Sequence, residues 1–200
     1  MTKKALKLLL LRQLKAICWF IGIYALIMAI VLVVFSYVKI DDTSWMPDSI
    51  IYTPKIYLLV VGIIYPLILT KLYVSNGLTR KQFFMAFTGA ISIISLLLLI
   101  PILASMIYFD SISLLPAITH YLHMPLFFFI GWTSVIGFQL QKRGMSMLGI
   151  LSAVVIFHAM TTIPRILALS DLTVLVSVLL LLASFLLILP RIIYQIPLKS

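Results

Sequence analysis

The chain has 200 residues, of which 64% are hydrophobic and 10% are charged. Soluble domains contain roughly 45–50% apolar and about 25% charged residues, so this composition excludes a soluble enzyme and indicates an integral membrane protein. A net charge of +10 would suggest nucleic acid for a soluble protein. Here the anionic surface of a bilayer explains it, and we predict no nucleic-acid partner.

The first element expected along the chain is a basic N-terminal amphipathic helix over residues 2–15. Its cations lie roughly on one face, although leucines share that side. Two arrangements of this helix are open. It is either a cytoplasmic extension of the first span or a separate helix on the inner membrane surface. The cations are Lys3, Lys4, Lys7, Arg12 and Lys15.

Six apolar stretches follow, each about as long as the roughly 20 residues that cross a bilayer as a helix. They predict an all-α, polytopic fold in which residues 1–200 form a single transmembrane domain. The fifth stretch is the shortest, and residues 158–171 could be partly re-entrant. Six spans leave little chain for a nucleotide-binding domain, so any ATP would be hydrolysed by a partner. The expected spans are about 16–38, 56–74, 83–108, 116–138, 146–163 and 172–190.

Basic residues divide unequally between the two sides that these spans define. Twelve fall on the side of the termini, and three, Lys39, Lys55 and Arg165, fall on the other. Loops rich in Lys and Arg stay in the cytoplasm. The sequence therefore predicts a cell-membrane protein with both termini cytoplasmic. The twelve are Lys3, Lys4, Lys7, Arg12, Lys15, Lys71, Arg80, Lys81, Lys142, Arg143, Arg191 and Lys199.

The connection between the second and third spans contains a strongly specified turn. Asn76-Gly77 is a turn dipeptide, because both residues tolerate positive φ. Thr79 and Gln82 have the spacing of a capping box, and Leu78 and Phe83 that of a hydrophobic staple, so a helix should begin at Thr79.

Two cations in the first turn of that helix need a further explanation. The positive end of the helix dipole disfavours Arg80 and Lys81 there by about 0.3–1 kcal/mol each. The anionic inner leaflet is one compensating partner, and an acidic protein surface docked on the turn is the other. We expect aromatic side chains at this turn to be exposed.

The stretch Ser75-Asn-Gly-Leu-Thr-Arg-Lys-Gln-Phe-Phe84 resembles the segment after the second span in type-2 ATP-binding-cassette (ABC) exporter permeases of Gram-positive bacteria. In that family a short cytoplasmic coupling helix at this place fits a groove of the ATP-binding subunit. The resemblance implies alternating access in a homo- or heterodimer of permeases, with Mg-ATP bound by the partner subunit and no cofactor in this chain. The implied coupling residues are Asn76, Gly77, Leu78, Thr79, Arg80, Lys81, Gln82 and Phe83.

Polar residues inside the spans supply the remaining candidates. His158, with Thr161 and Thr162 after it, either lines a substrate path or bonds to a neighbouring helix. His120 and His123 share one helical face, but zinc needs at least one more ligand, so interfacial histidines are expected and no metal site is predicted.

Three hypotheses of function follow from these observations. The first is the membrane subunit of an ABC exporter, without enzymatic activity, for an amphipathic or hydrophobic substrate such as a peptide, lipid or drug. The alternative is a stand-alone immunity or regulatory membrane protein with no transport activity. An intramembrane enzyme is disfavoured, because the chain has no glutamate and no complete catalytic motif.

Overall fold

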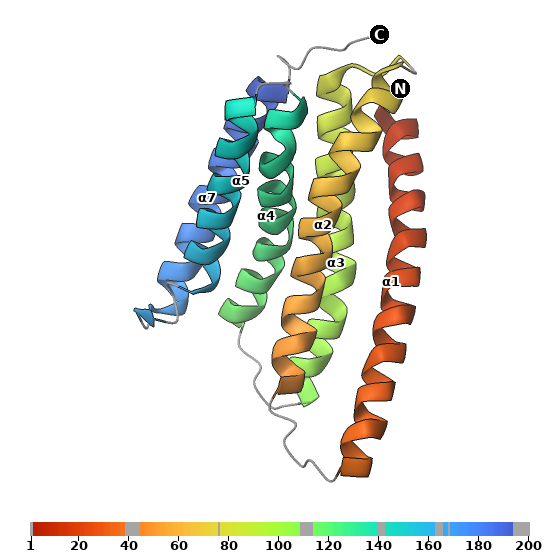
Figure 1. Ribbon diagram of the computed structural model, residues 1–200, viewed down its shortest axis with the longest axis vertical. Helices are drawn as coiled ribbons and strands as arrows, with labels where there is room; N and C mark the ends of the chain where they lie inside the picture. Colours follow the sequence, from red (N-terminus) through yellow and green to blue (C-terminus); the bar gives the residue numbers. More distant parts are fainter. Residues whose placement is uncertain are drawn as a thin grey trace.

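A computed structural model describes residues 2–38, 45–75, 77–108, 114–139, 143–162, 166–167 and 169–193. Within these ranges the fold is all-α, as predicted, and consists of six helices (Figure 1). They are α1 (Thr2–Val38), α2 (Trp45–Ser75), α3 (Arg80–Tyr108), α4 (Leu114–Gln139), α5 (Arg143–Thr161) and α7 (Asp171–Ile193).

Five of the six helices are long and apolar enough to cross a membrane, judged by length and composition. The qualifying segments are Leu10–Val31, Ile51–Thr70, Arg80–Ala104, Leu114–Ile136 and Asp171–Ile193. Helix α5 has a shorter apolar part, Ser146–Met160, as expected for the shortest predicted span. Residues 163–165 and 168, inside the stretch considered re-entrant, lie outside the described residues.

The basic N-terminal segment is not a separate surface helix, which corrects one of the two expected arrangements. Helix α1 runs without interruption from Thr2 to Val38, so the basic residues occupy the first turns of the helix that contains the first apolar segment. Residues 2–31 contain neither proline nor a long polar stretch, and the only glycine before Val38 is Gly22. Nothing in this part of the sequence therefore favours a bend.

Helix α2 begins about eleven residues earlier than the predicted second span, at Trp45 instead of residue 56. Pro47 lies in its first turn, where a missing backbone N–H costs little. Lys55 was predicted to lie among the loop cations, but it is inside α2 and only 4% exposed. Lys39 and Arg165, the other two cations of that side, lie outside the described residues.

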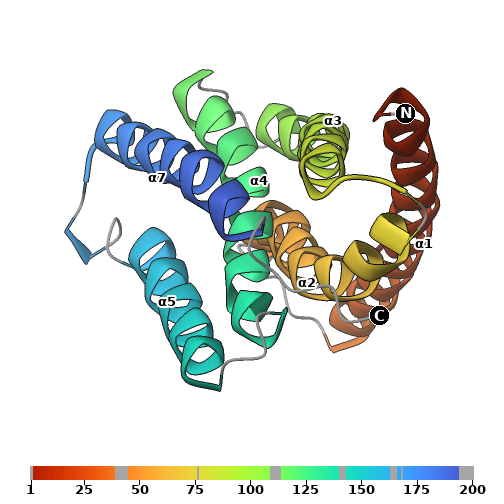
Figure 2. The same ribbon diagram turned by 90° about the horizontal axis from the view of Figure 1, so that it is seen from above.

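The helices form an elongated bundle with chemically different ends. The start of α1, the α2–α3 connection and the end of α7 share one end, called the turn end below (Figure 1). Helices α2 and α4 begin at the opposite end, called the cavity end because a cavity described below lies near it. Seen from above, α4 lies in the centre, while α1 lies at one edge and packs mainly on α3 (Figure 2).

Aromatic residues cluster among aliphatic ones in the core, and aliphatic residues also cover much of the outside. Trp132 and Phe83, Phe87 and Phe128 are fully buried, whereas Leu26, Leu180 and Leu187 are each more than 60% exposed. A soluble protein rarely exposes so much contiguous apolar surface. This surface suits lipid, in which helices associate through close packing and not through water exclusion.

Glycines allow α2 and α4 to cross in backbone contact. A Cβ atom built on Gly62 would lie 2.1 Å from the carbonyl oxygen of Phe128, and one on Gly131 would lie 2.2 Å from that of Leu59. Both distances are far below van der Waals contact. The crossing therefore requires glycine at both positions, and it fixes how α2 and α4 face each other.

Candidate functional site: the α2–α3 turn and a polar cavity

The α2–α3 turn has the local conformation that its sequence predicts. Gly77 has a φ of +83°, in the left-handed region that glycine adopts without steric cost. It lies two residues beyond the end of α2, where many helices are terminated by such a glycine. Asn76, the other half of the predicted turn dipeptide, lies outside the described residues.

A reciprocal capping box starts α3, as predicted. The Thr79 amide donates to the Gln82 side-chain oxygen, and the Gln82 amide donates to Thr79 Oγ1, both at 3.2 Å. The Phe83 amide donates to the Thr79 carbonyl at 2.9 Å, which is the first bond of the helix. These bonds satisfy amides that a helix N-terminus otherwise leaves without partners.

The aromatic residues after the cap are buried, which corrects the expectation that they are exposed. Phe83 is fully buried and Phe84 is 6% exposed. The Phe83 ring centroid lies 5.5 Å from that of Phe87 and 6.2 Å from that of Trp132 on α4. Phe83 therefore cannot contact a docked protein. It anchors the start of α3 to the centre of the bundle, with Leu78 partly buried against the same core.

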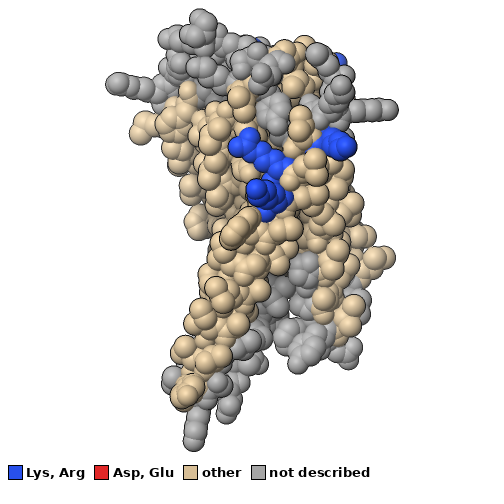
Figure 3. Space-filling model, turned by 90° about the vertical axis from the view of Figure 1, so that its right-hand side faces the viewer, with Lys and Arg blue, Asp and Glu red and all other residues tan. Residues whose placement is uncertain are grey.

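Exposed cations surround the turn end of the molecule. Lys81 is exposed and Arg80 is half-buried on the first turn of α3, which contains no acidic residue. Lys7, Arg12 and Lys15 are exposed on α1. Figure 3 shows Lys and Arg side chains gathered toward this end on the α1 face, with no acidic side chain visible among the residues described there. The side chains of Lys3 and Lys4 lie outside the description.

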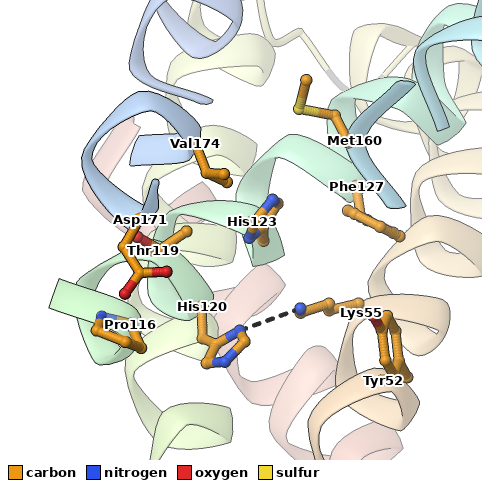
Figure 4. Close-up of a pocket in the computed structure, with 10 residues that line it drawn as sticks. All are labelled: Tyr52, Lys55, Pro116, Thr119, His120, His123, Phe127, Met160, Asp171 and Val174. Atoms are coloured by element: carbon orange, nitrogen blue, oxygen red, sulfur yellow. Dashed lines mark hydrogen bonds between the residues drawn. The ribbon is translucent and has the colours of Figure 1, made fainter. Parts of the chain in front are cut away.

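A polar cavity of about 270 Å³ lies near the cavity end, between α2, α4, α5 and α7. Lys55 Nζ lies 3.2 Å from His120 Nδ1 and 4.9 Å from the centre of the Tyr52 ring (Figure 4). Burying a cation is costly unless hydrogen bonds and nearby polar groups stabilise it. The full set of residues around the cavity is Tyr52, Lys55, Pro116, Thr119, His120, His123, Phe127, Met160, Asp171 and Val174.

His123 also lines this cavity, one helical turn beyond His120 on α4. It is only 6% exposed, and neither ring nitrogen makes a hydrogen bond to a described residue. Buried polar atoms usually have hydrogen-bond partners, and these two nitrogens are themselves buried beside the cavity. No group of three or more His, Cys, Asp or Glu suited to a metal ion occurs within the described ranges.

Asp171 contributes the negative charge at the rim of the cavity. Ser170 caps α7, with its hydroxyl 3.3 Å from the Thr173 amide, and Asp171 is the first residue of that helix. A carboxylate there interacts favourably with the helix dipole. In Figure 4 Asp171 lies beside Thr119 and Pro116, on the other side of His120 from Lys55.

The predicted substrate-path residues lie next to this cavity but do not line it. His158 is exposed and lines a separate apolar groove of about 440 Å³ between α2, α4 and α5. Thr162 is exposed just after α5, and the Thr161 side chain lies outside the description. Besides His158, the groove is bounded by Leu59, Ile63, Ile130, Gly131, Ser134, Ile150, Ala153, Val154 and Phe157.

Sequence reasoning missed Lys55 and assigned the two histidines to the interface. The available signal was that Lys55 adjoins the predicted second span while His120 and His123 share one face of the fourth. Only the packing of α2 against α4 brings these groups together. Comparisons with protein-family models, with curated proteins and with solved structures find no match for this chain.

Proposed function

We propose that the chain is the membrane-spanning subunit of an ABC exporter, with its turn end and both termini in the cytoplasm and the cavity end outside the cell membrane. The asymmetry of basic residues supports this orientation. ATP hydrolysis belongs to a separate subunit that binds Mg-ATP, and a second permease chain completes the transporter. This chain carries out no chemical step itself.

The observation that carries the proposal is the capped, basic α2–α3 turn, which Phe83 anchors to the bundle. The capping box fixes the start of α3. Two cations lie in the first turn after it: Arg80, which is half-buried, and Lys81, which is exposed. The helix dipole disfavours cations in this turn, and an acidic protein surface docked on exposed Lys81 would offset that cost, as the anionic inner leaflet also would. A groove in an ATP-binding subunit provides such a surface.

The ring contacts of Phe83 would transmit a movement of this turn into the bundle. Phe83 packs against Phe87 within α3 and against Trp132 on α4. A displacement of the turn would therefore move the start of α3 together with the part of α4 around Trp132. Nucleotide drives such a change only if it binds one arrangement of the complex more tightly than the other.

Charge reversal at the turn tests this proposal. In Arg80→Glu/Lys81→Glu, attraction to an acidic surface becomes repulsion, and we expect about tenfold or greater loss of co-purifying ATPase. The protein itself should remain folded, because acidic residues are favoured in the first turn of a helix. The measurement is the ratio of ATPase to permease after purification from native membranes.

The matched control is Arg12→Glu/Lys15→Glu, which makes the same charge change at exposed positions of α1. It should retain the ATPase. Undiminished ATPase in the turn variant would contradict the coupling role, and so would equal loss in both variants. Absence of any nucleotide-dependent partner of the wild-type chain would instead favour a stand-alone immunity or regulatory protein.

A further inference from the structure

The polar cavity and the apolar groove lie on successive turns of the same three helices. On α2, Lys55 of the cavity is followed four residues later by Leu59 of the groove. On α4, Phe127 is followed three residues later by Ile130, and on α5 Met160 is preceded three residues earlier by Phe157. Residues three or four apart share a helix face, so cavity and groove follow one another along a single surface.

The rings of Phe127 and Phe157 connect the lining of the cavity to the lining of the groove. The ring centroids of Phe127 and Phe157 lie 5.4 Å apart, edge to face. Phe127 lines the cavity and Phe157 lines the groove. From Met160 to Ile150 along α5 the combined surface extends about 15 Å, at the rise of an α-helix. That length accommodates roughly a dozen extended chain atoms.

The cavity contains charged and polar side chains, whereas the groove is mainly apolar. An amphiphile has the same division, between a polar head and an apolar tail. The cavity contains Lys55, 4% exposed, and His123, 6% exposed with neither nitrogen bonded to a described residue. The groove is lined mainly by aliphatic and aromatic side chains, with Ser134 and His158 as the polar exceptions. The Ser134 hydroxyl already donates to the Gly131 carbonyl at 2.6 Å.

We infer that this surface binds an amphiphile, with an anionic phosphate or carboxylate head at Lys55, His120 and His123 and an alkyl chain along the α2–α4–α5 groove. The Lys55 ammonium supplies a charge-assisted hydrogen bond to the head, and His123 supplies a ring N–H as a second donor. Asp171 lies on the far side of His120 from Lys55 and repels an anion at the rim (Figure 4). The inference rests on the proposed function and specifies its substrate class.

Lipid binding to the purified chain tests the inference without the ATPase. The protein in a neutral detergent is titrated with phosphatidylglycerol, with phosphatidylcholine and with laurate, and bound ligand is counted by native mass spectrometry. We expect one tightly held anionic amphiphile per chain. Tighter retention of phosphatidylglycerol identifies a bilayer lipid as the source, whereas tighter retention of laurate identifies a single-chain cargo.

Two substitutions in the cavity should change the affinity for the anionic amphiphile in opposite directions. Lys55→Met should weaken binding of the anionic amphiphile by about ten- to a hundredfold, the usual range for losing a hydrogen bond to a charged group. Asp171→Asn removes the opposing charge and should tighten binding of the anionic amphiphile. Lys15→Met, which removes an exposed cation on α1, should weaken binding by less than about fivefold.

Val154→Trp tests the groove independently of the cavity. Val154 lines the groove and is 49% exposed, so a larger side chain there obstructs the groove without entering the core. It should weaken binding of laurate, while inorganic phosphate at high concentration should still compete for the head site. Helical circular dichroism of each variant confirms folding.

Three results would overturn the inference: equal retention of phosphatidylcholine and phosphatidylglycerol, unaltered binding in Lys55→Met, or equal losses in Lys55→Met and Lys15→Met. The last would mean general attraction of lipid to basic residues. If the ATPase still co-purifies in any of these cases, the proposed coupling survives and only the substrate class is wrong.

Discussion

At the scale of single residues, Gly77 determines whether the α2–α3 turn can form. Its φ of +83° lies in the region where a Cβ meets the following carbonyl oxygen. Among the described residues, no atom lies within 4 Å of a Cβ added at Gly77. The cost of a substitution there is thus conformational and does not include a packing clash.

Gly77→Ala should lower the free energy of unfolding by about 1–2 kcal/mol, the cost of a left-handed conformation for an L-residue. Gly22→Ala is the matched control, because Gly22 lies within α1 and also has open space around it. That substitution should be neutral or stabilise by up to about 1 kcal/mol. Unfolding in mixed micelles, followed by circular dichroism, measures both, and equal effects would contradict the assignment of strain to the turn.

Local residue chemistry predicted the α2–α3 turn, whereas tertiary packing decided the rest of the site. Thr79 and Gln82 are three residues apart, so their reciprocal bonds depend on nothing distant. The burial of Phe83 depends on Trp132, which is far away in sequence. The cavity likewise joins Lys55 of α2 to His120 of α4. Hydrophobicity shows that these helices exist but not which faces meet.

At the scale of helices, the α2–α4 crossing holds the cavity and the groove in shape. Gly62 and Gly131 place the two backbones in contact, and Gly131 also lines the groove. Gly149 brings α5 close to α4 in a similar manner, since its Cβ would lie 2.7 Å from the Thr133 carbonyl oxygen. Small residues at such contacts are typical of helix packing in lipid.

Gly131→Ala should force α2 and α4 apart and destabilise the bundle by about 1–3 kcal/mol, the usual cost of overpacking. The added atom would meet backbone, which cannot change rotamer to avoid it. Gly144→Ala, near the start of α5 with no atom within 4 Å of an added Cβ, is the control. The measurement is the denaturant midpoint in micelles. A Gly131→Ala variant as stable as Gly144→Ala would show that the crossing is looser than the structure indicates.

The apolar stretches of the sequence predicted which helices form better than they predicted where each helix begins and ends. The apolar stretch 83–108 starts three residues after α3 does, at Arg80, whereas the capping box predicted that start correctly. The second span was predicted to begin at residue 56 because charged and proline residues over 47–55 interrupt the apolar stretch, whereas α2 begins at Trp45. Helix α2 as a whole packs on α4, a tertiary contact that the hydropathy of the segment does not reveal.

At the scale of the whole molecule, α4 connects the two ends. Trp132 contacts the Phe83 anchor of the turn, and His123 of the same helix lines the cavity. The nine residue steps from His123 to Trp132 span about 14 Å at the α-helical rise. A movement imposed at the turn would therefore reach the cavity through one continuous helix, as the proposed export cycle requires.

Site-directed crosslinking in native membranes tests contact between the turn and an ATP-binding subunit most directly. Cys18 is the only cysteine in the chain, so Cys18→Ser/Lys81→Cys provides a single thiol at an exposed position of the turn. Cys18→Ser/Ile107→Cys provides one at a 64% exposed position near the cavity end of α3. The account predicts a crosslink to an ATPase from position 81, with a yield that changes with ATP, and none from position 107. No ATPase crosslink from position 81, with the protein folded and present in the membrane, would contradict it.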